Sequence, residues 1–482
     1  MAKPARIASL LVLASVAACS FAPPYARPTT AVPPAFKEGG PWRVAAPADT
    51  EPRGDWWTLF GDPVLTELEM RVVSANPTLA SALSRYDQAQ AYLAIAAAGA
   101  GPRAEIDTSF TRNRQSDHRP LRSANQPTFY AANTISGLFS YELDLWGRVR
   151  NAVAAGRASV AASNFDTATL TLSLQTQLAT QYLRLRGYDQ ELKLLDDTVA
   201  AYAQADALNR RRFEGGIASG LDASRSGAQL KEAEAEREDV RASRALIEHA
   251  IASLTGTPAS SFTLALTATA FPIPATPVGV PSLLLERRPD IAAAERRVAA
   301  ANAEIGVARA AFFPAITLAG SGGFQNTGGP LLTAGNTLWS VGPGAVLALL
   351  DGGRRRAQLA IAREARDLAA DDYRGTVLQA FQQVEDDLAL SAHLSDEAVA
   401  QDEAVRQAGI TERLSLNRYV EGASTYLDVV TAQTTALRTR RAAIVLRTRR
   451  LQTSVQLITA TGGGWTPSVT ARAPIPPAAA GG

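Results

Sequence analysis

The sequence predicts a mainly α-helical fold with a smaller β component, built as two structurally equivalent halves. The first observation behind this prediction is a repeat that extends over about two hundred residues. Pro77 corresponds to Pro289, 212 positions later, and Phe213 corresponds to Tyr419, 206 positions later. The second observation is a long segment without proline in each half. Together they indicate a pseudo-symmetric molecule.

The offset changes from 212 to 206 between Pro102 and Trp146. A six-residue difference in one loop is expected to account for this change. The two halves are predicted to span 56–270 and 271–463, each in the order helix, strand pair, long helix, tip and returning helix. In the first half, the strand pair is predicted at 104–145, the long helix at 148–212 and the returning helix at 221–254. In the second half, the first helix is predicted at 289–311, the strand pair at 315–349, the long helix at 354–418 and the returning helix at 427–459.

The first helix of each half is expected to begin at a proline. Pro77 and Pro289 suit the first turn of a helix, where a backbone N–H is not needed. Leu79 and Leu83 follow at helical spacing, and Pro102 ends the pattern.

The predicted strands alternate with a period of two residues. Ile106, Thr108 and Phe110 share one face, and Glu105 and Asp107 share the other. Such alternation is typical of strands in a membrane barrel, although an ordinary soluble sheet also shows it. Four strands cannot close a barrel, and an open edge leaves backbone groups unpaired in lipid. Strands that cross a membrane would therefore require several copies of the chain.

The long helices of about 65 residues would each extend roughly 100 Å at 1.5 Å per residue. Leu174, Leu178 and Leu185 in the first, and Val377 and Val384 in the second, recur at helical spacing. A sustained apolar stripe on helices of this length predicts coiled-coil packing.

Each tip carries a helix-ending glycine, Gly216 or Gly422, before the returning helix. The next residues have the spacing of helix N-terminal caps: Ser219 with Asp222, and Thr425 with Asp428. Both aspartates therefore have a structural role as first-turn acids, which does not exclude a second role.

Residues 1–18 are predicted to be a signal peptide, with Lys3 and Arg6 before an apolar stretch too short to span a bilayer. The sequence then ends in Val-Ala-Ala before Cys19, which resembles a bacterial lipobox. This implies cleavage before Cys19 and attachment of acyl chains such as palmitate; an ordinary signal peptide is the alternative. A proline-rich segment, 19–55, is expected to be extended, and the tail, 464–482, to be flexible.

Composition argues against several functions. A formal charge of +2 in 482 residues gives no electrostatic basis for binding nucleic acid. Cys19 is the only cysteine, so neither a disulfide nor a cysteine metal cluster is expected. The three histidines are isolated, and no catalytic, cofactor-binding or metal-binding residues are predicted. An enzyme is therefore not expected.

Three sets of residues resemble one family. The tips share the pattern R-[FY]-x-x-G-x-x-[ST]-x-x-D, from Arg212 to Asp222 and from Arg418 to Asp428. The second set is Trp56-Trp57 with the apolar residues Phe60, Leu65 and Leu68 that follow it, and the third is Arg288-Pro289-Asp290. Together, the three sets resemble the corresponding segments of TolC- and OprM-like outer membrane factors. The lipobox places the chain near the lipoprotein members of this family, the NodT-type branch.

The resemblance implies a homotrimer in the outer membrane, lipid-anchored, with a twelve-stranded barrel and a long periplasmic α-barrel. It also implies a function: the exit channel of a tripartite efflux or secretion system, such as those of multidrug resistance. The implied partners are a periplasmic adaptor protein, an inner membrane pump of the RND type, and outer membrane lipid. The implied adaptor-docking residues are those of the tips: Arg212, Phe213, Gly216, Ser219, Arg418, Gly422 and Thr425.

The resemblance further implies gate residues. Tyr419 and Asp428 match positions of gating links and acidic entrance rings in the family, and Asp222 is the equivalent of Asp428 in the first tip. Ser424 and Thr431 stand where TolC carries an arginine and an aspartate, so a TolC-type salt link is not expected. A ring of carboxylates in a narrow neck would favour cations.

A coiled-coil lipoprotein of the cell envelope without a pore is the alternative function, and the strand pairs argue against it. The substrate is left open among drugs, aromatic solvents, metal ions and peptides.

Overall fold

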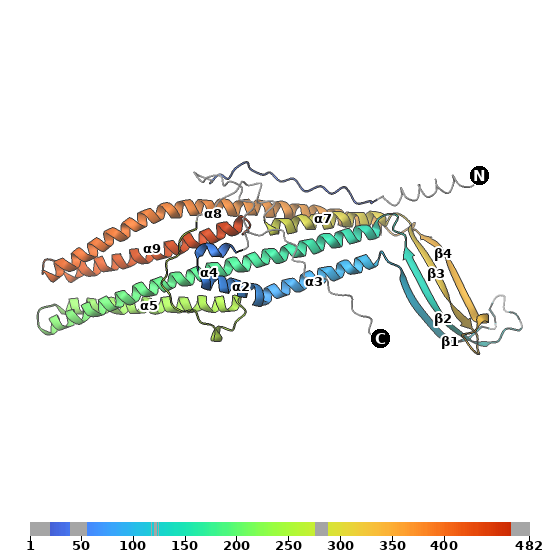
Figure 1. Cartoon of the computed structure of the whole chain (residues 1–482), viewed down its shortest axis with the longest axis horizontal. Helices are drawn as coiled ribbons and strands as arrows, with labels where there is room; N and C mark the ends of the chain where they lie inside the picture. Colours follow the sequence, from blue (N-terminus) through green and yellow to red (C-terminus); the bar gives the residue numbers. More distant parts are fainter. Residues whose placement is uncertain are drawn as a thin grey trace. The chain divides into compact units, whose positions relative to one another are not determined.

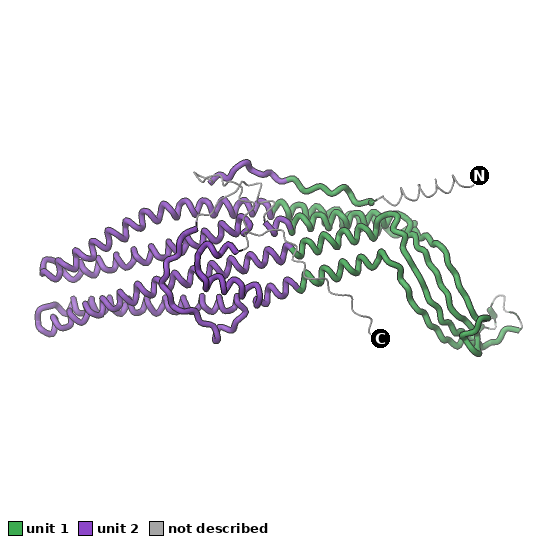
Figure 2. Tube along the Cα trace, in the orientation of Figure 1, with its two compact units in different colours: residues 1–29, 84–164, 293–375 green, residues 30–83, 165–292, 376–482 purple. Residues whose placement is uncertain are grey.

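The computed structural model describes residues 20–38, 55–274 and 288–463, apart from 117, 120–122 and 124. It consists of long helices and one four-stranded sheet, as the sequence predicts (Figure 1). The chain divides into two compact units (Figure 2): unit 1 contains 1–29, 84–164 and 293–375, and unit 2 contains the remainder. The predicted signal peptide, Cys19 and the C-terminal tail lie outside the described residues.

The internal repeat is reproduced element by element. The paired elements have equal lengths: 22 residues in α3 (Pro77–Ala98) and α7 (Pro289–Ala310), 67 in α4 (Arg148–Glu214) and α8 (Arg354–Val420), and 35 in α5 (Gly220–Leu254) and α9 (Tyr426–Ala460). Within the first half, a short 3-10 helix, η1 (Trp56–Phe60), and helix α2 (Pro63–Ala75) precede α3. Two further 3-10 turns, η2 (Ala259–Ser261) and η3 (Ala334–Asn336), lie in connections.

None of the helices in these described ranges is both long and apolar enough to cross a bilayer.

The change of offset has more than one source, so the prediction of a single six-residue loop difference is wrong. Strands β1 (Arg103–Arg114) and β3 (Ala315–Asn326) both have 12 residues. In contrast, β2 (Phe129–Glu142) has 14 residues and β4 (Thr337–Val346) has 10. The loop 115–128 is also longer than the loop 327–336, and the connection 143–147 is shorter than 347–353. The offset is the net result of all three differences.

The four strands form one antiparallel sheet in the order β1-β2-β3-β4. Residues paired across strands point to the same face. One face is mostly apolar, and the row through its middle is Thr108, Ile135, Phe324 and Thr337, flanked by Ile106, Phe139, Trp339 and Val341. The opposite face is mostly polar and includes Asp107, Ser136, Ser321 and Ser340. The alternation predicted from sequence is therefore continuous across all four strands.

The second predicted strand was expected to reach residue 145, but β2 ends at Glu142. The Leu143 backbone N–H still donates to the Ile316 carbonyl, at 2.8 Å. The chain then turns through Gly147, whose φ of 74° is favourable only for glycine, into α4.

In unit 1, residues 20–29 contain no helix or strand and lie along α7. The Phe21 ring stacks on Phe313, with centroids 4.4 Å apart, and on Trp146. The Asn302 amide donates to the Pro23 carbonyl at 2.9 Å. The predicted extended segment therefore has specific contacts in its described residues 20–29, whereas its residues 39–54 lie outside the described ranges.

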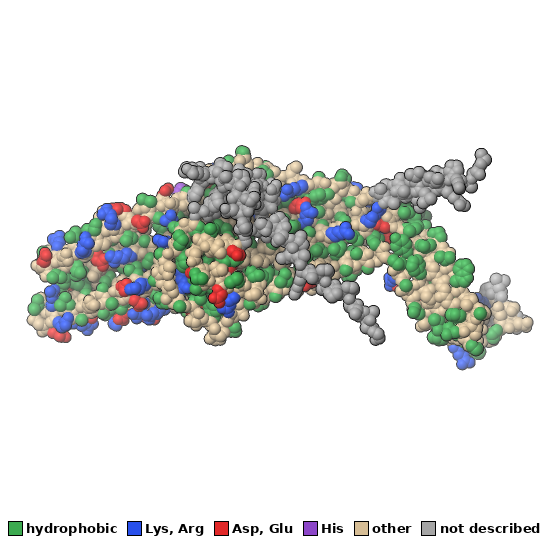
Figure 3. All heavy atoms as spheres, in the orientation of Figure 1, with side chains coloured by type: hydrophobic (Ala, Val, Ile, Leu, Met, Phe, Trp, Pro, Cys, Tyr) green, Lys and Arg blue, Asp and Glu red, His purple; other side chains and the backbone are tan. Residues whose placement is uncertain are grey.

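In unit 2, the largest apolar core forms where η1 and α2 pack on the middle of α4. Its members include Trp57, Phe60, Leu178, Tyr182 and Val455. The Tyr182 hydroxyl donates to Asp62, the residue that also caps α2, at 2.5 Å. This core fixes the middle portion of α4, whereas the helical hairpin ends expose both charged and apolar side chains (Figure 3).

Candidate functional site: the helical hairpin ends

The two hairpin ends, or tips, consist of residues 212–222 and 418–428. In the first, the Ile217 backbone N–H donates to the Arg212 carbonyl at 2.7 Å, and the Gly216 N–H donates to the Phe213 carbonyl at 2.9 Å. Gly216 has a φ of 71°. This pair of bonds and a left-handed glycine define the Schellman type of helix end.

The second tip repeats this geometry. The Ala423 N–H donates to the Arg418 carbonyl at 2.8 Å, the Gly422 N–H donates to the Tyr419 carbonyl at 3.0 Å, and Gly422 has a φ of 75°. The two glycines thus end their helices as the sequence predicts, and three residues lie between each glycine and the returning helix.

Both tip aspartates act as caps. The Asp222 backbone N–H donates to the Ser219 hydroxyl oxygen at 3.2 Å, and that hydroxyl donates to the Asp222 carboxylate at 2.8 Å. Thr425 and Asp428 form a capping box, with the Thr425 N–H donating to the Asp428 carboxylate at 3.1 Å. The expected capping role is confirmed for both.

Tyr419 connects the two hairpins. Its hydroxyl donates to the Asn209 side-chain oxygen, at 2.9 Å, and the Arg212 guanidinium lies over its ring, 5.6 Å from the centroid. Asn209 is only 1% exposed. A partly buried hydrogen bond and a cation–π contact therefore join the end of α8 to the end of α4.

A second set of polar contacts, next to Tyr419, joins the returning helices α5 and α9. The Tyr426 ring is 5.3 Å from that of Tyr419, and the Tyr426 hydroxyl donates to Gln229 on α5 at 3.4 Å. The Gln229 amide in turn donates to Gln433 on α9 at 3.1 Å. Burial raises the pKa of Tyr426 to about 12, so this hydroxyl stays protonated across the physiological range. These contacts join the two returning helices through uncharged groups.

Sequence reasoning missed Asn209, Gln229 and Gln433. No motif includes them, and only the structure shows that they face the opposite hairpin. One weak indication for Asn209 was present in the sequence: it lies one helical turn before Arg212, the first residue of the tip motif. Of the predicted gate residues, only Tyr419 joins the hairpins; within the described chain no hydrogen bond or ion pair links Asp222 or Asp428 to Tyr419.

The tips also expose apolar side chains. The exposed fractions are 50% for Phe213, 81% for Ile217 and 61% for Val420. No ion pair joins the two tips in the described residues, and Ser424, in place of the arginine of TolC, has a buried hydroxyl without a partner there.

The fold and its tips define a class: paired helical hairpins of equal length combined with a two-faced four-stranded sheet, as in outer membrane channels with a helical extension. Comparison with known proteins gives the family. The family described as outer membrane efflux protein matches residues 71–257 and 280–463. The chain therefore belongs to the outer membrane efflux protein family, and its resemblance to TolC- and OprM-like factors is confirmed.

Individual relatives agree with this assignment. Outer membrane protein OprJ of Pseudomonas aeruginosa is 32% identical over 470 residues, which cover 96% of this chain and 97% of OprJ. Nodulation protein T of Rhizobium leguminosarum bv. trifolii is 33% identical over 427 residues, covering 86% of this chain and 88% of the relative. The solved outer-membrane channel OprN superposes with a TM-score of 0.85 at 27% identity, covering 93% of this chain and 100% of that one.

The protein is an efflux exit channel of the outer membrane with a periplasmic extension. Its relatives are transport channels and not known enzymes. Because the solved relative is a channel, the alternative of a rod without a pore is set aside.

Proposed function

We propose that three copies of this chain form one conduit, with a twelve-stranded barrel in the outer membrane and a tunnel of long helices in the periplasm. The observation that carries the proposal is the open sheet. Strands β1 and β4 each pair on one side only within the described chain. Backbone groups at such edges must be paired in lipid, and the edges of neighbouring copies can pair with each other.

The two faces of the sheet support this arrangement. Ile106, Trp339 and Val341 on the apolar face are 81%, 77% and 68% exposed in the single chain, as expected of side chains that face lipid. Asp107 and Ser136, on the polar face, would then line a water-filled interior.

The tips are the proposed contact with a periplasmic adaptor protein, which connects the conduit to an inner membrane pump of the RND type. The exposed Phe213, Ile217 and Val420 support an interaction there, because exposed apolar side chains that cluster on a soluble part of a protein mark interaction surfaces. Membership of an efflux family supports the pump.

The tips also form the proposed gate. At rest, the Tyr419–Asn209 hydrogen bond and the Arg212 contact hold the hairpins of one copy together. Adaptor binding would separate them. Around the neck, the Asp222 and Asp428 carboxylates of all copies would contribute a negative ring that favours cations.

The ring can be tested without loss of the cap. In Asp428→Asn, the side-chain oxygen can still accept from the Thr425 N–H, but the charge is lost. We expect helicity to be unchanged and the preference for cations in planar bilayers to fall. An unchanged reversal potential in a salt gradient would mean that Asp428 acts only as a cap.

The proposed lipid anchor, Cys19, lies outside the described residues. We expect Cys19→Ala to abolish incorporation of labelled palmitate while trimers still assemble, because the anchor is separate from the strand edges. Labelling of the variant at the level of the native chain would contradict the anchor.

The conduit itself is tested by mass and by conductance. We expect native mass spectrometry of the detergent-solubilised protein to give three times the chain mass, and planar bilayers to show discrete conductance steps. A protein that is only monomeric, or trimers that never conduct, would exclude the conduit.

A further inference from the structure

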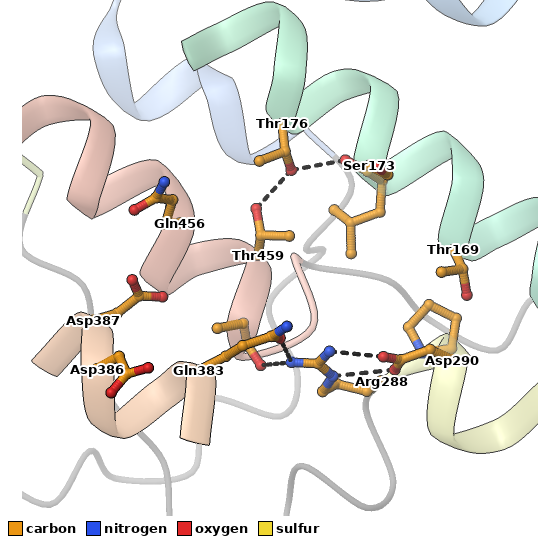
Figure 4. A pocket seen from close by; sticks show the side chains of 13 residues that line it. Thr169, Ser173, Thr176, Arg288, Asp290, Gln383, Asp386, Asp387, Gln456 and Thr459 are labelled. Carbon is orange, nitrogen blue, oxygen red and sulfur yellow. Dashed lines mark hydrogen bonds and ion pairs between the residues drawn. The ribbon is translucent and has the colours of Figure 1, made fainter. Parts of the chain in front are cut away.

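A cavity of about 450 Å³ lies within unit 2, away from the tips. Its walls come from four elements: the middle of α4, the start of α7, α8, and the last turns of α9 (Figure 4). This volume is within the range of small-molecule sites in proteins. The walls include both charged side chains and hydroxyl groups, so the cavity can form ion pairs and hydrogen bonds with a ligand.

Asp387 is the most unusual group in the wall. It is only 8% exposed, and in the described part of the chain its carboxylate accepts no hydrogen bond and forms no ion pair. Figure 4 shows its side chain extending from α8 toward the α9 side of the cavity. Burial, together with the neighbouring Asp386, raises the pKa of Asp387 to about 7, an effect that Arg288 only partly offsets. An ionised carboxylate that is buried without a partner is unfavourable, so this group favours a cation or a proton.

Arg288 does not supply the missing partner. Its guanidinium donates to both Asp290 carboxylate oxygens, at 2.7 and 3.1 Å, and also to Gln383 and to the Ala460 carbonyl. Asp290 thus balances the charge of Arg288. The faces of α4 and α9 contribute no titratable side chain to the wall. Asp386 and Asp387 therefore leave the cavity with an excess of negative charge.

The internal repeat shows that this acid pair is not needed by the architecture. Asn76, the counterpart of Arg288, donates to the Leu254 carbonyl at 2.8 Å, as Arg288 donates to that of Ala460. The structural bond to the end of the returning helix is thus present in both halves. In contrast, the residues 206 positions before Asp386 and Asp387 are Thr180 and Gln181, which are uncharged. The same helices pack in the first half without the two acids.

We propose that this cavity binds a small organic cation, with its ammonium group against Asp386 and Asp387. A metal ion is disfavoured because no group of three or more His, Cys, Asp or Glu in the described ranges is arranged to hold one. Thr176 and Thr459, whose hydroxyls are 2.7 Å apart, face the same space and can hydrogen-bond a hydroxyl group of the ligand. The site requires no contact from another copy of the chain, so it does not depend on the proposed trimer.

Choline and its neutral isostere 3,3-dimethylbutan-1-ol provide the test, because they share shape and hydroxyl and differ in charge. We expect isothermal titration of the full-length protein in detergent to detect choline and not the neutral compound. In Asp387→Gln, which introduces the residue of the first half, affinity should fall about tenfold or more. Asp402→Asn, which removes an exposed acid elsewhere on α8, is the matched control and should bind as the native chain does.

The pH dependence gives a readout that needs no variant. Protons compete for Asp387, so choline should bind about tenfold more weakly at pH 6 than at pH 8. Absence of saturable choline binding, equal binding of the neutral isostere, or unchanged affinity in a correctly folded Asp387→Gln would each overturn the proposal. Circular dichroism and mass of the variant show whether it is folded.

Discussion

Glu69 is a carboxylic acid in the middle of an apolar surface. It lies on the buried side of α2 with Leu65, Leu68 and Val72, and it is 0% exposed. Neither of its carboxyl oxygens has a hydrogen-bond partner among the described residues. Burial raises the pKa of Glu69 to about 9, so the folded protein holds a neutral carboxylic acid here at physiological pH.

This residue makes stability depend on pH. In the unfolded chain, Glu69 has an ordinary pKa of about 4.3 and releases its proton, whereas the folded chain keeps it. The stabilising contribution is therefore complete below about pH 4.3 and is lost as pH rises through about 9. The predicted slope from this one group is about 1.4 kcal/mol per pH unit between these values.

Replacement of Glu69 by methionine should remove this dependence. We expect Glu69→Met to raise the midpoint of thermal unfolding at pH 8, by an amount equivalent to roughly 4–5 kcal/mol, because the variant no longer has a proton that the folded chain keeps and the unfolded chain releases. The gain should be smaller at pH 5. Glu67→Met, on the exposed side of the same helix, is the control and should change little at either pH. Equal midpoints of the native chain and Glu69→Met at pH 8 would contradict the prediction.

At the scale of elements, the hydrogen bond between Tyr419 and Asn209 is the contact through which the proposed gate can be tested most directly. Tyr419→Phe keeps the ring under Arg212 and removes only the hydrogen bond to Asn209. Loss of about 1 kcal/mol would shift a closed–open equilibrium about fivefold toward the open state. We therefore expect a higher open probability in planar bilayers for Tyr419→Phe.

Two comparisons isolate this hydrogen bond. Asn209→Ala should open the channel to a similar degree, and the double variant should open it no further, because both changes remove the same bond. Tyr188→Phe, the same chemical change on α4 far along the chain from the tip, should leave conductance as in the native chain. Additive effects of Tyr419→Phe and Asn209→Ala would show that the bond does not hold the gate.

The sequence predicted the helices well where residues close in sequence determine where a helix begins and ends. Proline at the first helical turn, glycine after the last, and Ser/Thr-x-x-Asp at the next start are local signals, and α7, α8 and both caps follow them. Contacts between distant segments carried no such signal. Asp189, which is 0% exposed, accepts from Arg186 and Arg244 at 2.8 and 2.6 Å. Nothing in the spacing of these residues distinguishes them from solvated charges on a helix.

The same limit applies to the candidate sites. Tyr419 was found through its motif, but its partner Asn209 and the cavity around Asp387 depend on which helix faces lie together. The repeat became more informative once the structure was available. It distinguishes contacts that both halves contain from residues that only one half contains. The hydrogen bond from Asn76 or Arg288 to the end of the returning helix is present in both halves, whereas Asp386 and Asp387 have no acidic counterpart in the first half.

At the scale of the whole molecule, the decisive feature is the pair of chemically different faces on one sheet. Substitutions at two neighbouring residues of β1 test the role of the two faces, because Ile106 lies on the apolar face and Asp107 on the polar face. If three sheets close into a barrel, an arginine at 106 must enter lipid, whereas an arginine at 107 remains in water. The first change should cost about 2–4 kcal/mol in the membrane, and the second should cost little.

We therefore expect Ile106→Arg to lower the amount of trimer recovered from outer membranes, and Asp107→Arg to assemble at the native level. Asp107→Arg should instead reduce the preference for cations in planar bilayers, because it reverses a charge in the proposed interior. Both variants introduce the same side chain in the same strand, so a difference between them reports the face and not a general effect of arginine on β1. Equal recovery of the two trimers would show that Ile106 does not face lipid, and with it the proposed closure of the sheet would fail.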